Sequence, residues 1–336
     1  MSRDLLWRNG PDRPPVVLVT GASSGIGRAT ALQLAGRGVR LVLVARSVQS
    51  LTAAARQCRA AGATVLVVPA DVADADAVEG AFAAAARRFG QVDAVVHAAA
   101  VVAYGRFEEV PTAAFDRVLS TNLTGTANVA RSALLHFKAS GGGRLVVVGS
   151  LLGKIAAPFM ASYVTSKWAV HGLVRTIQVE ARSVPGLEVS LVSPGGVDTP
   201  VYHQAASWLG RQGRPPPPVD PPEKVAHAVV RALERPRRES SVGPANPVVV
   251  LGFRAFPAVF DALVTPLMRL GGLGRDAVEP HEGNVFEPRP AGDAVHGQWG
   301  RHWLRPVGAV GAVGAVAGAA AGAVRWAGSR RAKVLG

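Results

Sequence analysis

Three polar residues in the middle of the chain have the types and the spacing needed for proton transfer. Tyr163 and Lys167 stand four residues apart, and Ser150 precedes the tyrosine by thirteen residues. On a helix, residues four apart share a face, so the phenol and the ammonium are expected side by side. A phenol with a pKa of about 10 is a poor acid–base group at neutral pH, and a nearby ammonium is expected to lower that pKa. Ser150 is expected to donate to a carbonyl oxygen in the same space. The plainer alternative is that Tyr163 is a buried core tyrosine.

Asn122 is a fourth candidate for this chemistry. It lies within a long predicted helix, and its amide is expected to bind a water linked to Lys167. A purely structural asparagine is the alternative.

A glycine-rich turn near the start of the chain has the spacing of an anion-binding loop. The sequence TGASSGIG at 20–27 follows a short apolar run and precedes a predicted helix. Glycine lets the backbone turn tightly and approach a pyrophosphate, and the free N–H groups of a helix N-terminus favour an anion. An ordinary strand-to-helix turn is the alternative. The expected cofactor contacts in this turn are Gly21, Ser23, Ser24, Gly25, Ile26 and Gly27.

The ends of the next two predicted strands indicate which dinucleotide is bound. Where many dinucleotide-binding folds place an acid on the ribose 2′-OH, this chain has Arg46. An arginine can pair with a 2′-phosphate, so NADP(H) is predicted over NAD(H), although Arg46 could also be a solvated loop residue. Asp71 and Val72 close the third strand. Asp71 is expected either to accept from the adenine amine or to cap the following helix.

Strands and helices alternate along the first 250 residues, which predicts a parallel sheet with helices on both faces. Apolar runs predict strands at 16–19, 41–44, 64–68, 94–96, 144–148 and 188–192, with a last strand beginning at 241–242. Helices are expected at 28–36, 51–61, 75–89, 115–137, 162–182 and 223–233. The proline-rich stretch 202–222 is expected to be loop or polyproline. The predicted fold is therefore a doubly wound, three-layer α/β/α domain.

Two later segments are apolar. Between 248 and 270, large apolar residues recur at steps of three and four, which predicts one helical face kinked by Pro257 and Pro266. The face comprises Phe253, Phe256, Phe260, Leu263, Leu267 and Leu270. Residues 307–324 form an uncharged Gly/Ala/Val segment that would span about 27 Å as a helix, close to a bilayer's apolar thickness. Either membrane contact or a flexible low-complexity tail fits this composition.

Composition narrows the class of protein. Of the 336 residues, 49% are hydrophobic and 18% charged, which suits a globular protein with a sizeable core. The formal net charge of +14 owes much to six basic residues that follow Asp293, where acidic residues end. Without aromatic–basic interleaving, this pattern argues against nucleic-acid binding. The single cysteine, Cys58, excludes an intrachain disulfide and a thiolate zinc site. The eight histidines form no ligand cluster, so no metal site is predicted. Residues 1–15 lack the apolar stretch of a signal peptide, so a cytoplasmic location is expected.

Together these motifs resemble those of the short-chain dehydrogenase/reductase family. The resemblance covers about residues 16–250 and rests on TGASSGIG (20–27), DV (71–72), NLTG (122–125), GS (149–150), YVTSK (163–167) and PGGVDT (194–199). It implies a catalytic tetrad at Asn122, Ser150, Tyr163 and Lys167, a sheet of about seven strands, and a homo-oligomer. It also implies cofactor contacts from Val72, Ala98, Tyr163, Lys167, Pro194, Gly195, Val197 and Thr199. One departure is His97-Ala98-Ala99-Ala100, where the family usually has Asn-Asn-Ala-Gly; an altered stability and affinity are expected there.

The leading hypothesis is an NADP(H)-dependent enzyme that interconverts a carbonyl and an alcohol on a hydrophobic substrate, with Tyr163 as the general acid/base. The alternative is a dinucleotide-binding scaffold or sensor that the tail tethers to a membrane or partner. We expect four parts: an N-terminal tail (1–15), a catalytic domain (16–250), an apolar helical extension near the substrate site (251–290) and a basic tail (291–336).

Overall fold

The computed structural model describes residues 13–299 and is built on one large parallel sheet. Seven strands lie in the order β12-β7-β6-β4-β1-β2-β3, and every neighbouring pair is parallel. The strands are β1 (Val16–Thr20), β2 (Arg40–Ala45), β3 (Thr64–Pro69), β4 (Ala94–His97), β6 (Gly143–Val148), β7 (Leu187–Pro194) and β12 (Glu239–Val242). The doubly wound parallel sheet predicted from the sequence is confirmed.

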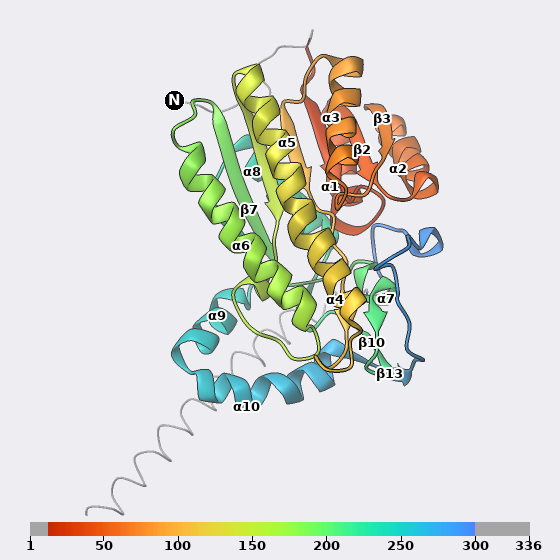
Figure 1. Cartoon of the computed structure of the whole chain (residues 1–336), viewed down its shortest axis with the longest axis vertical. Coiled ribbons are helices and arrows are strands. Elements are labelled where there is room, and N and C mark those ends of the chain that lie inside the picture. The colour runs from red at the N-terminus through yellow and green to blue at the C-terminus, as the bar shows by residue number, and fades with distance from the viewer. Residues whose placement is uncertain (1–12, 300–336) are drawn as a thin grey trace, which may run out of the picture.

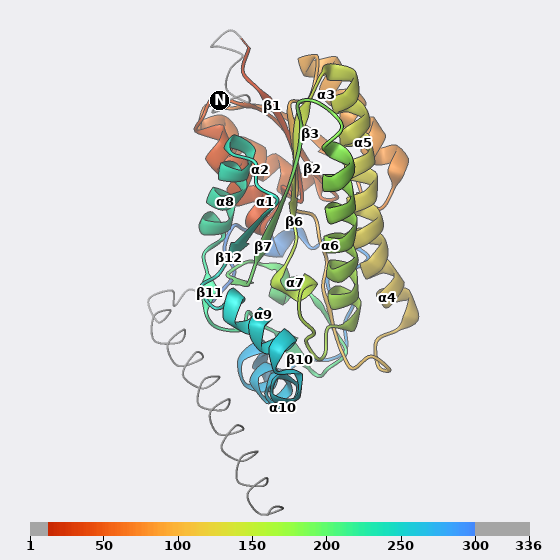
Figure 2. The same cartoon turned by 90° about the vertical axis from the view of Figure 1, so that its left-hand side faces the viewer.

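The strands read as continuous apolar runs because helices cover both faces of the sheet. In β1, Val17 and Val19 face one helical layer, and Val16 and Leu18 face the other. The first layer contains α1 (Gly25–Ala35), α2 (Val48–Ala60) and α8 (Pro222–Glu234). The second contains α3 (Ala75–Phe89), α5 (Gly125–Ser140) and α6 (Ala161–Ala181). Figure 2 shows the two layers on opposite sides of the sheet.

The helix predicted at 115–137 is interrupted in the structure. α4 (Thr112–Leu119) and α5 are joined by a π-helical turn, Ser120–Thr124, which contains Asn122. Such turns insert an extra residue and are frequent at functional sites. A sequence period of 3.6 extends through the turn, so the pattern alone did not reveal it.

The segment 202–222, which was predicted to be loop, contains a short helix and several short strands. These are α7 (Val201–Gln204), β9 (Ala206–Ser207), β10 (Arg211–Gly213) and β11 (Val219–Asp220). Each of the three strands pairs with a short strand from another part of the chain. β9 pairs with β5 (Ala103–Tyr104), β10 with β13 (Leu273–Ala277) and β11 with β8 (Gly196–Val197). The prediction was wrong here because two- and three-residue strands leave no periodic signal.

The apolar segment 248–270 forms two helices instead of one kinked helix. α9 spans Asn246–Ala255, with Phe256 as its C-cap, and α10 spans Pro257–Leu267. Pro257 suits the first position of a helix because it lacks an N–H. A second π-helical turn, Met268–Gly272, follows α10. The aromatic rings of Phe253 and Phe260 pack edge to face across the bend, 5.1 Å apart.

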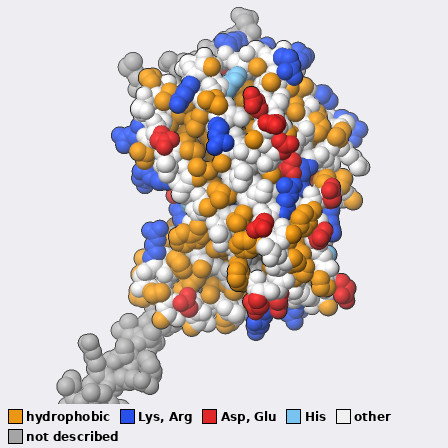
Figure 3. Space-filling model, in the orientation of Figure 1, with side chains coloured by type: hydrophobic (Ala, Val, Ile, Leu, Met, Phe, Trp, Pro, Cys, Tyr) orange, Lys and Arg blue, Asp and Glu red, His pale blue; other side chains and the backbone are white. Residues whose placement is uncertain are grey.

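The α9–α10 pair carries several exposed apolar side chains at the end of the molecule away from α2 (Figures 1 and 3). Leu251 and Leu267 are more than half exposed, and α10 contains no buried residue. Among residues 13–299, no helix is both long enough and apolar enough to cross a membrane. The apolar segment 307–324 lies outside the described residues.

Candidate active site

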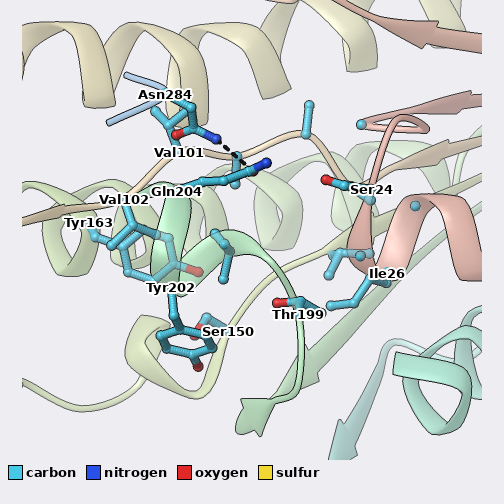
Figure 4. A pocket seen from close by; sticks show the side chains of 18 of the residues that line it. Ser24, Ile26, Val101, Val102, Ser150, Tyr163, Thr199, Tyr202, Gln204 and Asn284 are labelled. Carbon is cyan, nitrogen blue, oxygen red and sulfur yellow. Dashed lines mark hydrogen bonds between the residues drawn. The ribbon is translucent and has the colours of Figure 1, made fainter. Parts of the chain in front are cut away.

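The main pocket opens at the carboxyl ends of the parallel strands, next to the point between β1 and β4 where the strand order reverses. This is where open α/β sheets bind ligands. The cavity measures about 250 Å³, and Figure 4 shows side chains that line it. All but one of the site residues expected from the sequence line this single pocket, namely Gly21, Ser23, Ser24, Gly25, Ile26, Gly27, Arg46, Asp71, Val72, Ala98, Ser150, Tyr163, Lys167, Pro194, Gly195, Val197 and Thr199. The exception is Asn122.

The glycine turn after β1 has the close backbone packing of a phosphate cradle. Gly21 has a φ of +66°, and a Cβ on it would lie 2.7 Å from the backbone nitrogen of Ala99. A Cβ on Gly27 would lie 2.2 Å from the carbonyl oxygen of Gly21. Both positions therefore need glycine. The turn opens α1, whose first N–H groups supply the partial positive charge that a pyrophosphate requires, so these residues fit a dinucleotide.

The wall opposite the turn comes from the segment after β7. A Cβ on Gly25 would meet the side chain of Thr199 at 3.2 Å, so the two segments lie in close contact. Figure 4 shows Thr199 beside Ser24 and Ile26, at the other end of the site from Tyr163. The pocket therefore has one end at the glycine turn and another at Tyr163.

At the catalytic end, Ser150, Tyr163 and Lys167 converge. Ser150 is hydrogen-bonded to the Tyr163 hydroxyl, and the Lys167 ammonium lies 5.6 Å from the tyrosine ring centre. Lys167 is 4% exposed and donates to the carbonyl oxygen of Val148 at 3.1 Å. Burial lowers the pKa of Lys167 to about 8, so the ammonium remains charged at neutral pH.

The pKa of Tyr163 differs from the expectation of a lowered value. Burial raises it to about 12, and the hydrogen bond with Ser150 opposes that rise only in part. The physical reason is that burial disfavours the charged phenolate, and the Lys167 ammonium donates to the Val148 carbonyl instead of to the phenol. In this structure Tyr163 is therefore a protonated phenol and an available acid.

Asn122 lies behind the pocket wall instead of on it. Its amide oxygen accepts from the Val101 N–H at 2.9 Å, and its amide nitrogen donates to the Val101 carbonyl and to the Ser166 hydroxyl, both at 3.0 Å. Asn122 thus fixes the loop after β4 against α6, the helix that carries Tyr163 and Lys167. Its part in a water relay stays a prediction.

His97 explains how the chain tolerates the departure at 97–100. Its imidazole lies 2.8 Å from the Thr20 hydroxyl and 3.0 Å from the Thr126 hydroxyl, and it is 2% exposed. Burial and the nearby Lys167 lower its pKa to about 3, so the ring is neutral. His97 therefore ties the end of β4 to β1 and α5.

Asp71 does not cap α3. Asp74 caps that helix by accepting from the N–H groups of Asp76 and Ala77, so the capping alternative for Asp71 is wrong. Asp71 instead pairs with Arg117 of α4 and accepts from the Ala73 N–H. Burial raises the pKa of Asp71, but these two contacts outweigh it and leave the pKa below its usual value. Arg117 gave no signal in the sequence because the pair spans 46 residues.

The substrate end is lined by apolar and aromatic residues that the sequence analysis largely missed. Tyr104, Met160, Tyr202 and Met268 line the pocket and belong to one apolar cluster with Tyr163. Met268 comes from the turn after α10, so part of the predicted extension reaches the pocket wall. All three tyrosines of the chain line the pocket, and of these Tyr163 has the hydrogen bond with Ser150 and the contact with Lys167. Within residues 13–299, no group of His, Cys, Asp or Glu could hold a metal ion.

Comparison with known proteins agrees with this geometry. Residues 15–210 match the short chain dehydrogenase family. An uncharacterized oxidoreductase of Bacillus subtilis, YxnA, is 30% identical over 326 residues, covering 95% of this chain and 91% of the relative. A probable tetrahydroxynaphthalene reductase of Zymoseptoria tritici is 34% identical over 56% of this chain and 70% of its own length.

Among solved structures, an alcohol dehydrogenase from the archaeon Thermococcus sibiricus, complexed with 5-hydroxy-NADP, has a similar fold. It is 32% identical with a TM-score of 0.60, and the match covers 68% of this chain and 96% of that one. About a third of this chain therefore lies outside the match. On the sheet order, the pocket and these matches, the chain belongs to the short-chain dehydrogenase/reductase family and is an NAD(P)-dependent oxidoreductase of the type that acts on alcohols and carbonyls.

Proposed function

We propose that the chain is an NADP(H)-dependent oxidoreductase that interconverts a carbonyl and a secondary alcohol on a hydrophobic substrate, with Tyr163 as the general acid/base. The observation that supports this most is the meeting of Ser150, Tyr163 and Lys167 in the pocket that also holds the glycine turn. When bound, the nicotinamide supplies or accepts the hydride.

The protein's own residues transfer the proton and stabilise the charge on the reacting oxygen. Tyr163 donates its proton to the carbonyl oxygen during reduction, and Ser150 stabilises the charge on that oxygen by hydrogen bonding. Lys167 contributes a positive charge close to the tyrosine ring. Because the pKa of Tyr163 is about 12, its hydroxyl is protonated at neutral pH and can donate the proton. The tyrosinate that alcohol oxidation needs is rare at this pH.

Two features support NADP(H) over NAD(H). Arg46 lines the pocket after β2, and the residues beside it, Ala45 and Ser47, bring no carboxylate that would repel a 2′-phosphate. The solved relative from Thermococcus sibiricus carries a phosphorylated dinucleotide. Val72 and Asp71 line the same end and would lie beside the adenosine.

The substrate end supports a hydrophobic carbonyl compound. Met160, Tyr202 and Met268 surround Tyr163 with apolar surface, and the relative from Zymoseptoria tritici is named for a fused aromatic substrate. A cyclic or aromatic ketone fits these walls better than a sugar, whose hydroxyls would lose their hydrogen bonds to water.

The competing hypothesis of a scaffold or sensor loses its main support. It rested on the departure at 97–100, and His97 now has a structural role that leaves the pocket intact. Its other support, the basic tail, lies outside the described residues from 300 onward. A homo-oligomer remains a prediction.

The test is a substrate screen with each cofactor. Purified protein is given NADPH or NADH with a panel of cyclic ketones, aromatic ketones and small sugars, and oxidation is followed at 340 nm. We expect turnover with ketones and a preference for NADPH. Turnover confined to sugars would contradict the substrate class, and equal use of NADH would contradict the cofactor preference.

A further inference from the structure

A C-terminal segment crosses the phosphate-binding end of the pocket. We call residues 281–298 the strap. It follows β13 and runs beside α7 toward the first turn of α1 (Figure 1, blue). Asn284, Pro288, Arg289 and Asp293 of the strap line the pocket. In Figure 4, the hydrogen bond between Asn284 and Gln204 lies between the glycine turn and the catalytic tyrosine.

The strap places main-chain carbonyl oxygens on the two groups expected to bind the cofactor's phosphates. The N–H of Gly25, at the start of α1, donates to the Ala294 carbonyl at 2.8 Å. The Arg46 guanidinium donates to the carbonyls of Asn284, Val285 (3.2 Å) and Phe286 (2.8 Å). Carbonyl oxygens carry partial negative charge, so the strap satisfies an anion site with neutral acceptors.

The space left beneath the strap is small. The cavity of about 250 Å³ falls below the range of about 300–1,000 Å³ typical for drug-sized ligands, and a dinucleotide is larger than these. A bound dinucleotide also needs the Gly25 N–H, and NADP(H) in addition needs the Arg46 guanidinium, and the strap now occupies both.

We propose that the strap is a built-in competitor for the phosphate sites, and that the 2′-phosphate of NADP(H) displaces it from Arg46 whereas the 2′-hydroxyl of NAD(H) does not. At Arg46 the strap would thus respond to one dinucleotide and not to the other. This inference rests on the proposed preference for NADP(H).

The selectivity follows from the acceptors that compete for Arg46. A phosphate is charged and matches the fork of a guanidinium, so it forms stronger hydrogen bonds than neutral carbonyls do. A hydroxyl carries no charge and offers no such compensation. NADP(H) therefore replaces the strap's contacts at Arg46 with stronger ones, whereas NAD(H) leaves them in place.

Contacts outside the phosphate site hold both ends of the strap. At its start, His281 bridges to Ser207. Near its end, the Gly297 N–H donates to the Asp198 carbonyl at 3.3 Å, and His296 lies 2.9 Å from the Glu223 carboxylate on α8. The middle of the strap can therefore leave Arg46 and Gly25 while both ends stay attached.

The first experiment measures the strap directly, without turnover. Hydrogen–deuterium exchange of the strap is compared in the full chain alone, with adenosine 2′,5′-bisphosphate, and with adenosine 5′-monophosphate, the two probes at equal occupancy. We expect exchange at 284–294 to rise at least fivefold with the bisphosphate and to stay unchanged with the monophosphate. Slower or unchanged exchange with the bisphosphate bound, or failure of the bisphosphate to bind, would overturn the proposal.

The second experiment loosens the strap from outside the pocket. Gly283 has a φ of +55°, and a Cβ on it would lie 2.3 Å from the Gln204 carbonyl oxygen, so Gly283→Ala should dislodge the strap. A second variant, Glu223→Gln, has a smaller expected effect, because it removes only the carboxylate that contacts His296. The matched control is Gly62→Ala, which has a φ of +99° but open space around its Cβ.

With Gly283→Ala, we expect NADPH to bind at least fivefold more tightly, because it no longer has to displace the strap from Arg46, and NADH to gain less. Gly62→Ala should change neither. If Gly283→Ala does not fold, Glu223→Gln carries the test with an expected gain of about twofold. Weaker binding of both dinucleotides would show that the strap is a clamp, which contradicts the proposal.

The outcomes separate this inference from the proposed function. A chain that releases its strap with the bisphosphate yet reduces no carbonyl would refute the proposed function alone. A chain that reduces ketones with NADPH while the strap stays protected would refute the strap inference alone.

Discussion

Replacing Lys167 with methionine should make the protein more stable while it destroys activity. The ammonium is 4% exposed, and burial lowers its pKa from 10.5 to about 8. At about 1.4 kcal/mol per pKa unit, the folded state bears a cost of about 3 kcal/mol at pH 7. Methionine has a similar length and no charge. The substitution also loses the hydrogen bond to Val148, which is worth about 1–1.5 kcal/mol. We therefore expect Lys167→Met to raise the free energy of unfolding by about 1–2 kcal/mol at pH 7.

The pH dependence gives this prediction its sign. Because the folded pKa is depressed, the unfolded chain binds more protons between pH 8 and 10.5, and the wild-type protein gains stability relative to the variant as the pH rises through that window. Urea unfolding of both proteins at pH 7 and pH 10 measures the difference. The variant's advantage should shrink by about 2 kcal/mol at pH 10. A variant that is less stable at pH 7, or a difference that does not change with pH, would refute the account of a buried, charged lysine.

Three further predictions address other parts of the site. Ser150→Ala should lower kcat for ketone reduction by about 10²–10³, because it removes a donor to the reacting oxygen; a loss below tenfold in steady-state kinetics would argue against that role. Gly21→Ala should lower the free energy of unfolding by at least ~3 kcal/mol, because its Cβ would meet the Ala99 backbone at 2.7 Å. The control Gly38→Ala, with a φ of +71° in open space, should lower it by only about 1–2 kcal/mol. Equal losses in urea unfolding would contradict the close packing of the glycine turn. The pKa of His97 is about 3 in the folded protein, so protons bind preferentially to the unfolded chain as the pH falls. The free energy of unfolding of the wild-type protein should therefore fall by about 2 kcal/mol relative to that of His97→Asn between pH 7 and pH 5. A constant difference across that range would mean that His97 is not buried in its neutral form.

The sheet and the meeting of Ser150, Tyr163 and Lys167 in one pocket were predictable because their signals are local. A run such as Val16–Val19 identifies a strand buried on both faces, and the spacing of Tyr163 and Lys167 places both on one helical face. The glycine turn combines a strand end with a helix start within eight residues. Each of these patterns is read within one element, and the parallel sheet then brings the strand ends together.

Features that depend on distant contacts were missed. The pair of Asp71 with Arg117, the approach of Met268 to the pocket and the hydrogen bonds from Arg46 to the strap join residues far apart in the chain. The pKa of Tyr163 was also misjudged, because the sequence shows the neighbouring lysine but not the burial that outweighs it. Arg46 is the clearest example: its position was predicted, and its partners in the structure were not.

The central claim is that the hydroxyl of Tyr163 carries the proton to the substrate. The most direct test compares Tyr163→Phe with Tyr202→Phe, since both phenols line the same pocket. NADPH affinity is measured by fluorescence titration, and ketone reduction by single-turnover kinetics. We predict that Tyr163→Phe loses at least ~10³-fold in the rate of reduction while its NADPH affinity stays within about threefold, and that Tyr202→Phe loses less than about tenfold in rate. Reduction at close to the wild-type rate by Tyr163→Phe would contradict the account.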